Sequence, residues 1–284
     1  MAEEPKARIF TLVYRTFMAA FLLYLVMPLL AAGVFAFNDS LFPTLPWQGF
    51  TLDWFFNDSE PKLGMFHDGR LLRGLTNSLY IGVLVSLGSV FVGTWNAFLF
   101  ERVDFPFKRF LYLVMVVPLV IPGVIIGISI LLFASMVADG VWAVLGTSPD
   151  WLRPGIPLIV LGQCSFLITI TSLIIAARLQ QFDISQEEAA LNLGATRQRA
   201  LFTVTLPYLF PAMFSAFVVA FLVSFENFNT TMMLVGSDAP LSITMYDRIA
   251  KVGSTPVLNA VSVFLMVASG LLALSSVLVQ RKRP

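Results

Sequence analysis

Six long apolar runs dominate this sequence, and each is long enough to cross a lipid bilayer. A helix rises about 1.5 Å per residue, so a hydrocarbon core about 30 Å thick needs roughly 20 apolar residues. The runs that reach this length are residues 16–37, 77–100, 110–137, 155–177, 207–230 and 257–279. Because backbone polar groups inside a bilayer must be paired within the segment, these runs are expected to be helices. The sequence therefore predicts an all-α polytopic membrane protein with six transmembrane helices.

The composition supports a membrane protein over a soluble one. Hydrophobic residues make up 57% of the chain and charged residues only 12%, whereas a soluble domain carries about a quarter charged residues. The net charge of +1 gives no reason to expect a nucleic-acid partner. The first apolar run, about 22 residues long, exceeds the apolar stretch of a signal peptide, which predicts an uncleaved first helix.

Basic residues are distributed unequally between the two predicted sides of the membrane. With the amino terminus in the cytoplasm, the inner segments hold 12 of the 18 basic residues: Lys6, Arg8, Arg15, Arg102, Lys108, Arg109, Arg178, Arg197, Arg199, Arg281, Lys282 and Arg283. Cytoplasmic segments of membrane proteins are enriched in lysine and arginine. We therefore expect both termini in the cytoplasm, and outer segments at 38–76, 138–154 and 231–256.

The third predicted helix carries packing and bending signals, and the outer segments show weaker patterns. Gly123-x-x-x-Gly127 places small residues four apart, which allows neighbouring helices to approach closely. Pro118 and Pro122 each remove a backbone donor, which predicts a bent or partly unwound third helix. Residues 38–76 are expected to form a folded outer loop, although they show no clear period. Segment 138–154 is expected to be a loop in which Trp142 lies at the membrane interface.

The chain offers no residue set for catalysis or metal binding. It has one cysteine, Cys164, and one histidine, His67, which together cannot form a disulfide or a metal-ligand cluster. The phosphate-loop pattern GxxxxGK[ST] does not occur. We therefore expect a transporter subunit rather than an enzyme, with no catalytic residue, metal site or cofactor of its own. Any ATP hydrolysis would take place on a partner chain.

A polar stretch at 185–207 separates the fourth and fifth apolar runs. Ser185-x-x-Glu188 fits a capping box, in which each residue's side chain bonds the other's backbone amide. Gly194 stands where a left-handed turn would end that helix, and Thr196 can cap the next one. Pro207 is expected to end this second helix. The stretch therefore predicts two short helices that meet at a glycine.

The same stretch carries a family motif. Glu188-Ala189-Ala190, Gly194, Val204 and Leu206-Pro207 together resemble the EAA loop of inner-membrane permease subunits of binding-protein-dependent ABC importers, with valine in place of the usual isoleucine. The resemblance implies that Glu188, Ala189, Ala190, Gly194, Leu206 and Pro207 dock against a cytoplasmic ATPase subunit. Without it, Glu188 and Gly194 would only begin and end a helix.

A second segment indicates which permeases of this kind the chain resembles most. Its residues Lys251, Gly253, Pro256, Asn259 and Ala260 are similar to a pattern before the last helix of the PotC-like permeases of spermidine and putrescine importers. The resemblance covers most of residues 70–280 and implies a MetI-like permease in a bacterial inner membrane. The domains expected are an N-terminal part (1–76), a permease core (77–280) that includes the 185–207 loop, and a cytoplasmic tail (281–284).

That resemblance also implies a set of partners. These are ATPase subunits that bind ATP-Mg, a second and distinct permease subunit, a periplasmic solute-binding protein, and membrane lipid. The transported solute is expected to be a polyamine or related amine. An importer for an amino acid or related compound is the alternative. An ion-coupled secondary transporter is disfavoured because such proteins bury several ionisable groups near the membrane midplane.

Glu226 is the single acidic residue within the six apolar runs. A charge in hydrocarbon costs roughly 2.5 to 3.5 kcal/mol on insertion scales, so Glu226 should face either a water-filled path or the outer headgroups. Counting about 1.5 Å per residue places it about 27 Å along the fifth helix, near the outer end. Phe225 and Phe228 flank it and could help to bind an alkylammonium. Asn227 stands where polyamine permeases often have a second acid. These four residues are the candidate solute path.

Overall fold

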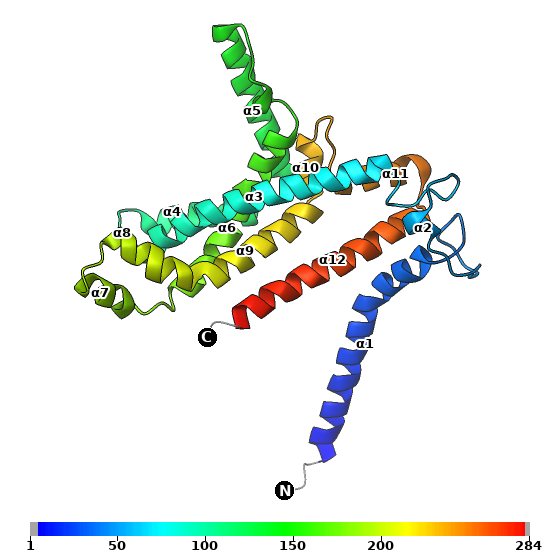
Figure 1. Ribbon diagram of the computed structural model, residues 1–284, viewed down its shortest axis with the longest axis horizontal. Helices are drawn as coiled ribbons and strands as arrows, with labels where there is room; N and C mark the ends of the chain where they lie inside the picture. The colour runs from blue at the N-terminus through cyan, green and yellow to red at the C-terminus, as the bar shows by residue number, and fades with distance from the viewer. Residues whose placement is uncertain (1–4, 282–284) are drawn as a thin grey trace. The chain divides into compact units, whose positions relative to one another are not determined.

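The computed structural model describes residues 5–281, and within this range its regular elements are helices (Figure 1). Six of them are long and apolar enough to cross a membrane: Phe10–Ala36, Gly69–Arg102, Gly123–Leu145, Ile156–Leu179, Arg197–Glu226 and Pro256–Val279. The prediction of an all-α protein with six membrane-spanning helices is confirmed.

The helical elements follow one another with short connections. In chain order they are α1 (Pro5–Ala36), α2 (Asp53–Phe56), α3 (Gly69–Arg102), α4 (Lys108–Val116), η1 (Val117–Leu119), α5 (Gly123–Leu145), η2 (Asp150–Leu152), α6 (Ile156–Leu179), α7 (Ser185–Asn192), α8 (Arg197–Ala200), η3 (Leu201–Thr205), α9 (Leu206–Glu226), α10 (Asn229–Leu234), α11 (Leu241–Val252) and α12 (Pro256–Arg281). They fall into two compact units. One contains the described residues up to Leu72 with Asp247–Ala268, and the other contains Arg73–Tyr246 with the described residues from Ser269 onward.

In the second unit, α6 is the central helix. It packs against α5, α9 and α10, and half of the residues in its most apolar stretch are buried. Two clusters of buried apolar side chains hold α3, α6 and α9 together: one includes Val85, Ile159 and Ala220, and the other includes Val90 and Leu209. In Figure 1 these three helices run alongside one another, while the far part of α5 extends away from them.

The small residues of α5 pack as predicted. A Cβ atom added to Gly127 would lie 2.8 Å from the Cβ of Met233 in α10, and one added to Gly123 would lie 2.8 Å from Thr230 Oγ1. Real Cβ atoms do not come so close to other atoms, so glycine is needed for the contact between α5 and α10.

The break in the third apolar run is confirmed, but its predicted bounds are wrong. The chain forms α4, a single turn η1 and then α5, which begins after Pro122. Pro118 and Pro122 lack the backbone donors that a continuous helix would need. At the other end, α5 continues to Leu145, so Trp142 lies on a helix and not in a loop. The helix ends where Gly146 adopts a left-handed conformation (φ 68°).

The prediction that Pro207 ends the helix before it is wrong. Residues Arg197–Glu226 form one continuous helical span, in which the π-helical turn η3 precedes Pro207. There the Leu206 amide donates to the Leu201 carbonyl, five residues back. Pro207 then lies in the first turn of α9, where a missing donor costs little. The far end of the span was also misplaced, because α9 ends at Glu226 instead of residue 230.

In the first unit, the segment after α1 is folded, as expected, and Asn38 organises it. The buried Asn38 side chain donates to the Thr44 carbonyl (3.1 Å) and accepts from the Gln48 amide (2.9 Å). Its carbonyl accepts from the Trp54 indole (2.9 Å). These bonds satisfy polar groups that would otherwise be buried unpaired.

Asp68 forms the N-terminal cap of α3 and pairs with Arg248 of α11. Its carboxylate accepts from the amides of Arg70 (3.0 Å) and Leu71 (3.2 Å), and the Arg248 guanidinium lies against it. Burial raises the pKa of Asp68, but the hydrogen bonds from Arg248 and Leu71 outweigh burial and lower the pKa overall. This link holds the start of α3 to α11.

Candidate functional site

The 185–207 loop contains the predicted pair of short helices, α7 and α8. Between them Gly194 has a φ of +89°, in the left-handed region that favours glycine. Its amide donates to the Leu191 carbonyl (2.9 Å) and the Ala195 amide donates to the Ala190 carbonyl (3.0 Å), which completes the end of α7. The Thr196 hydroxyl accepts from the Arg199 amide (3.3 Å) and caps α8. The left-handed turn at Gly194 and the Thr196 cap are confirmed.

The predicted capping box at Ser185 and Glu188 is wrong. Ser185 is already the first helical residue of α7, and no side chain caps this helix at Ile184. Instead, Asp183 accepts from the Ser185 amide (3.0 Å). Hydrogen bonds from Ser185 lower the pKa of Asp183. Asp183 thus takes the capping role that was predicted for Ser185. Glu188 is exposed, and no hydrogen bond or ion pair in the described chain involves its side chain.

Glu187, which precedes the motif, anchors the loop to two other elements. One carboxylate oxygen accepts from Arg102 Nη1 at the end of α3 (3.3 Å), and the other accepts from the Thr205 hydroxyl in η3. About three quarters of each side chain in the Glu187–Arg102 pair is buried, since both are 23% exposed. The Arg102 guanidinium also lies over the Phe182 ring, 5.4 Å from its centroid. The position of α7 is therefore set by Glu187.

Aromatic and polar contacts fix the two segments that flank the loop. Before it, Gln180 donates to Glu101 at the end of α3 (2.9 Å). After it, Tyr208 lies under the Arg178 guanidinium (4.1 Å to the ring centroid) and contacts Phe182 edge to face (5.0 Å between centroids). Cation–π and aromatic contacts of this kind stabilise a fixed arrangement. The loop is thus held at both ends on α3, α6 and α9.

The other side of the loop is exposed. Leu193 is 90% exposed, and Ile184 and Phe202 are also exposed apolar side chains. The motif residues Glu188, Ala189, Gly194 and Pro207 are exposed, while Ala190 and Leu206 are half-buried. A fixed loop that exposes several apolar side chains and an unpaired carboxylate offers a surface that a partner protein can cover.

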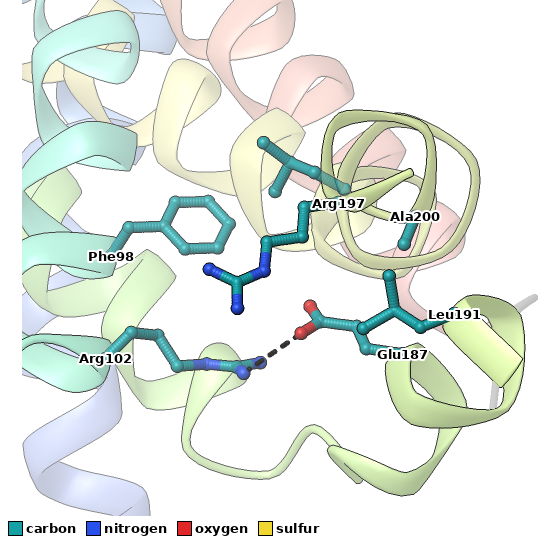
Figure 2. A pocket seen from close by; sticks show the side chains of 7 residues that line it. Phe98, Arg102, Glu187, Leu191, Arg197 and Ala200 are labelled. Atoms are coloured by element: carbon teal, nitrogen blue, oxygen red, sulfur yellow. Dashed lines mark hydrogen bonds and ion pairs between the residues drawn. The ribbon is translucent and has the colours of Figure 1, made fainter. Parts of the chain in front are cut away.

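Between the loop and the end of α3 there is a pocket of about 310 Å³ (Figure 2). Phe98 and Arg102 of α3 form one wall, and Glu187 and Leu191 of α7 form another. Arg197 of α8 extends into the pocket between Phe98 and the Glu187 carboxylate, as Figure 2 shows. Two guanidinium groups and one carboxylate line it, which leaves a net positive charge.

The candidate solute-path residues lie at the other end of α9. Glu226 is the last residue of the helix, and its side chain is exposed. Asn227 accepts through Oδ1 from both the amide (3.3 Å) and the hydroxyl (3.1 Å) of Thr231. Phe225 contacts Phe221 of its own helix (5.9 Å between centroids) and Phe228 contacts Tyr246 (4.9 Å). The structure therefore groups Asn227 with Thr231 rather than with Glu226.

A buried polar network supports this end of α9. Gln163 of α6, 1% exposed, accepts from the Ser224 hydroxyl and donates to the Thr231 hydroxyl (2.9 Å). Thr231 in turn donates to Asn227. Hydrogen bonds between helices inside a membrane contribute about 0.6 kcal/mol each on average. The sequence signal for this network was Gln163, a polar residue inside an apolar run.

Comparison with known proteins identifies the family of the chain. The family model described as "binding-protein-dependent transport system inner membrane component" matches residues 87–283, more than half of the chain. The chain belongs to this family.

Curated relatives are permeases of polyamine transport systems. The Escherichia coli (strain K12) putrescine permease PotI is 27% identical over 253 residues, covering 87% of this chain and 83% of PotI. The spermidine/putrescine permease PotC of the same strain is 27% identical over 270 residues, covering 94% of this chain and 93% of PotC.

Solved structures share the fold. A bacterial ABC transporter that imports the acidic polysaccharide alginate gives a TM-score of 0.75 at 18% identity, over 98% of this chain and 96% of that one. The structure of a bacterial alginate ABC transporter in complex with an alginate pentasaccharide-bound periplasmic protein gives a TM-score of 0.70 at 17% identity, over 95% of this chain and 93% of that one. The predicted resemblance to MetI-like permeases is confirmed, and the chain is a multi-pass permease subunit of an ABC importer.

Two functional candidates were missed by sequence reasoning, namely Glu187 and Arg102. Glu187 stands next to the matched Glu188, and Arg102 is one of several basic residues that follow apolar runs. Because 85 residues separate the two in sequence, nothing in the local pattern indicates that they pair. The coupling role of the motif residues and the solute role of Glu226 stay predictions.

Proposed function

We propose that this permease subunit, with a second and distinct permease, forms the membrane path of an importer for a polyamine or related amine. In this proposal the 185–207 loop docks against a partner ATPase. The observation that carries the proposal is the two-sided construction of the loop. Glu187 fixes one side to α3 and η3, while Leu193 and Glu188 on the other side are exposed.

Such a loop can transmit movement in both directions. A partner that binds ATP-Mg and closes on the exposed side would push α7, and the contacts of Glu187 would pass that displacement to α3 and α9. A rigid connection is needed because a mobile loop would absorb the movement. Transport then requires two states of the path that lie close in energy, so that ATP binding and a loaded solute-binding protein can shift their populations.

The amine is supported by two independent observations. The relatives carry the names of putrescine and spermidine permeases, and Glu226 offers an exposed carboxylate at the end of α9. A cation attracted to this carboxylate would lie at one mouth of the path. An amino acid or related compound is the alternative solute, since an amino acid also carries an ammonium group.

The proposal includes a location. It places the chain in a bacterial inner membrane with both termini and the 185–207 loop in the cytoplasm. This orientation follows the excess of basic residues in the predicted inner segments, and it would bring the loop within reach of the ATPase. The periplasmic solute-binding protein would then meet the opposite ends of the helices.

Replacing Leu193 with aspartate tests the docking proposal. We expect Leu193→Asp to reduce the amount of ATPase that co-purifies with the tagged permease by at least about tenfold, because an unpaired carboxylate buried in an interface costs more than about 1.4 kcal/mol. Val252→Asp is the matched control, since Val252 is an exposed apolar residue (71% exposed) at the end of α11. Normal ATPase recovery with Leu193→Asp, or equal loss in both variants, would contradict docking by this loop.

A further inference from the structure

The pocket behind the 185–207 loop contains an arginine that is only half paired. Arg102 donates through Nη1 to Glu187 (3.3 Å), but its Nη2 is buried and has no hydrogen-bond partner in the described chain. A buried donor of a charged group without an acceptor is costly. The pocket has room for an acceptor, at about 310 Å³.

A second arginine reaches the same space. Arg197 extends from α8 into the pocket (Figure 2), and it forms no ion pair within the described residues. The one carboxylate of the pocket, Glu187, already accepts hydrogen bonds at both oxygens, from Arg102 and Thr205. Two guanidinium groups from different helices therefore line a cavity in which both oxygens of the one carboxylate are already hydrogen-bonded. This arrangement fits an oxyanion, and guanidinium groups bind phosphate well because their N–H groups match two of its oxygens.

The remaining walls are apolar, and the pocket lies where membrane helices end. Phe98, Leu191 and Leu201 line it beside the arginines. Arg102 is the last residue of the α3 span, so the pocket lies at the level where lipid headgroups meet helix ends. A soluble anion would not use the apolar walls, whereas the glycerol and first acyl carbons of a lipid would cover them.

We propose that this pocket binds the phosphate group of an anionic phospholipid. The phosphate lies between Arg102 and Arg197, where a small movement of the Arg102 side chain brings the buried, unpaired Nη2 within reach of a phosphate oxygen. The apolar part of the lipid contacts Phe98 and Leu201. Bound lipid links α3 to α8 in addition to the direct Arg102–Glu187 pair. This inference concerns lipid binding and does not depend on which solute is transported.

The test uses the full permease with its co-purifying subunits in a neutral detergent. Phosphatidylglycerol is added as mixed micelles, and its binding is measured by the shift in thermal unfolding temperature and by native mass spectrometry. We expect saturable binding that Arg197→Gln weakens by about tenfold, the effect of losing one strong charge-assisted contact. Arg199→Gln is the matched control, because Arg199 lies on the same short helix, is exposed, and does not line the pocket.

Each other result overturns the proposal in a defined way. Equal loss of binding in the Arg197 and Arg199 variants would mean general attraction to negative charge and no site. Equal stabilisation by phosphatidylcholine and phosphatidylglycerol would exclude selection for an anionic lipid. Inorganic phosphate at the same concentration is a further comparison. If it raised the unfolding temperature as much as phosphatidylglycerol does, and if Arg197→Gln abolished that effect, the pocket would bind a soluble anion in place of the lipid. Arg197→Gln is the primary variant because Arg197, unlike Arg102, has no ion pair whose loss could unfold the loop.

Discussion

Beside the start of α9, Glu187 of α7 accepts hydrogen bonds from Arg102 and from Thr205, the residue that precedes α9. At the other end of α9, Glu226 is the last helical residue and is exposed. The first carboxylate connects α7, α3 and η3. The second contacts no charged group in the part of the chain that the structure describes. Neutral groups organise its surroundings instead, through the hydrogen bonds of Gln163, Thr231 and Asn227.

This difference indicates different uses for the two acids. A carboxylate that is three quarters buried and doubly bonded is already committed to holding helices together. An exposed carboxylate without a partner remains available to a ligand or to the headgroup layer. In the proposed function, the start of α9 transmits movement and its end meets a charged solute.

Glu187→Ala should give the largest effect on both stability and transport. It removes the acceptor of Arg102 and Thr205 and leaves the Arg102 guanidinium with no carboxylate partner. Since the pair is partly exposed, we expect a loss of about 1–2 kcal/mol in unfolding free energy. We also expect at least a tenfold loss of ATP-driven uptake, because α7 is no longer fixed. Thermal unfolding and uptake by membranes of equal permease content would measure both.

The neighbouring acid provides the control for this variant. Glu188 is exposed and unpaired, so Glu188→Ala should change the unfolding free energy by less than about 0.5 kcal/mol, while still reducing uptake if it docks against the ATPase. Equal stability of the Glu187 and Glu188 variants would remove the distinction between the anchored and the exposed side of the loop.

A smaller effect is expected from Glu226→Gln. The change keeps the shape of the side chain and removes its charge. If the carboxylate attracts a cationic solute, uptake should fall by about tenfold, as expected for one charge pair that is partly screened by water. The unfolding temperature should stay the same because the side chain is exposed. Uptake of a labelled polyamine at several concentrations would measure the change.

Glu60→Gln serves as the matched control for Glu226→Gln, since Glu60 is another exposed carboxylate and lies in the loop after α2. Unchanged polyamine uptake in Glu226→Gln would show that Glu226 only reaches the headgroup layer. The same loss in Glu60→Gln would point to general attraction of cations to the protein surface. Either outcome would weaken the case for an amine as solute.

Sequence reasoning found the long elements because length and hydrophobicity determine them. The six spans, the glycine contact of α5 and the left-handed Gly194 follow from single residues or regular runs. It failed where two competing local signals were present. Ser185 and Asp183 can both bond the first turn of α7, and Asp183 does so. It also failed at the π-helical turn before Pro207, because no simple sequence pattern marks such a turn.

The candidate site was less predictable for the same reason. The exposed motif residues can be identified from their spacing, but the anchor they need comes from Arg102, far away in sequence. Similarly, Glu226 is conspicuous as a lone acid in an apolar run. The Asn227–Thr231 hydrogen bonds do not include Glu226, because α9 ends at Glu226. The apolar pattern placed the end of this helix four residues too late, at residue 230.

We propose that the 185–207 loop contacts the ATPase and that α11, in the predicted outer segment 231–256, lies on the opposite side of the membrane. Single cysteines at positions 193 and 252, made by Leu193→Cys and Val252→Cys in a Cys164→Ser chain, test both parts through cross-linking in assembled importer membranes. We expect position 193 to cross-link to the ATPase and to resist labelling by a membrane-impermeant thiol reagent added outside intact cells. Position 252 should be labelled from outside and should not cross-link to the ATPase. ATPase cross-linking at position 252 with none at position 193, or labelling of position 193 from outside, would contradict the account.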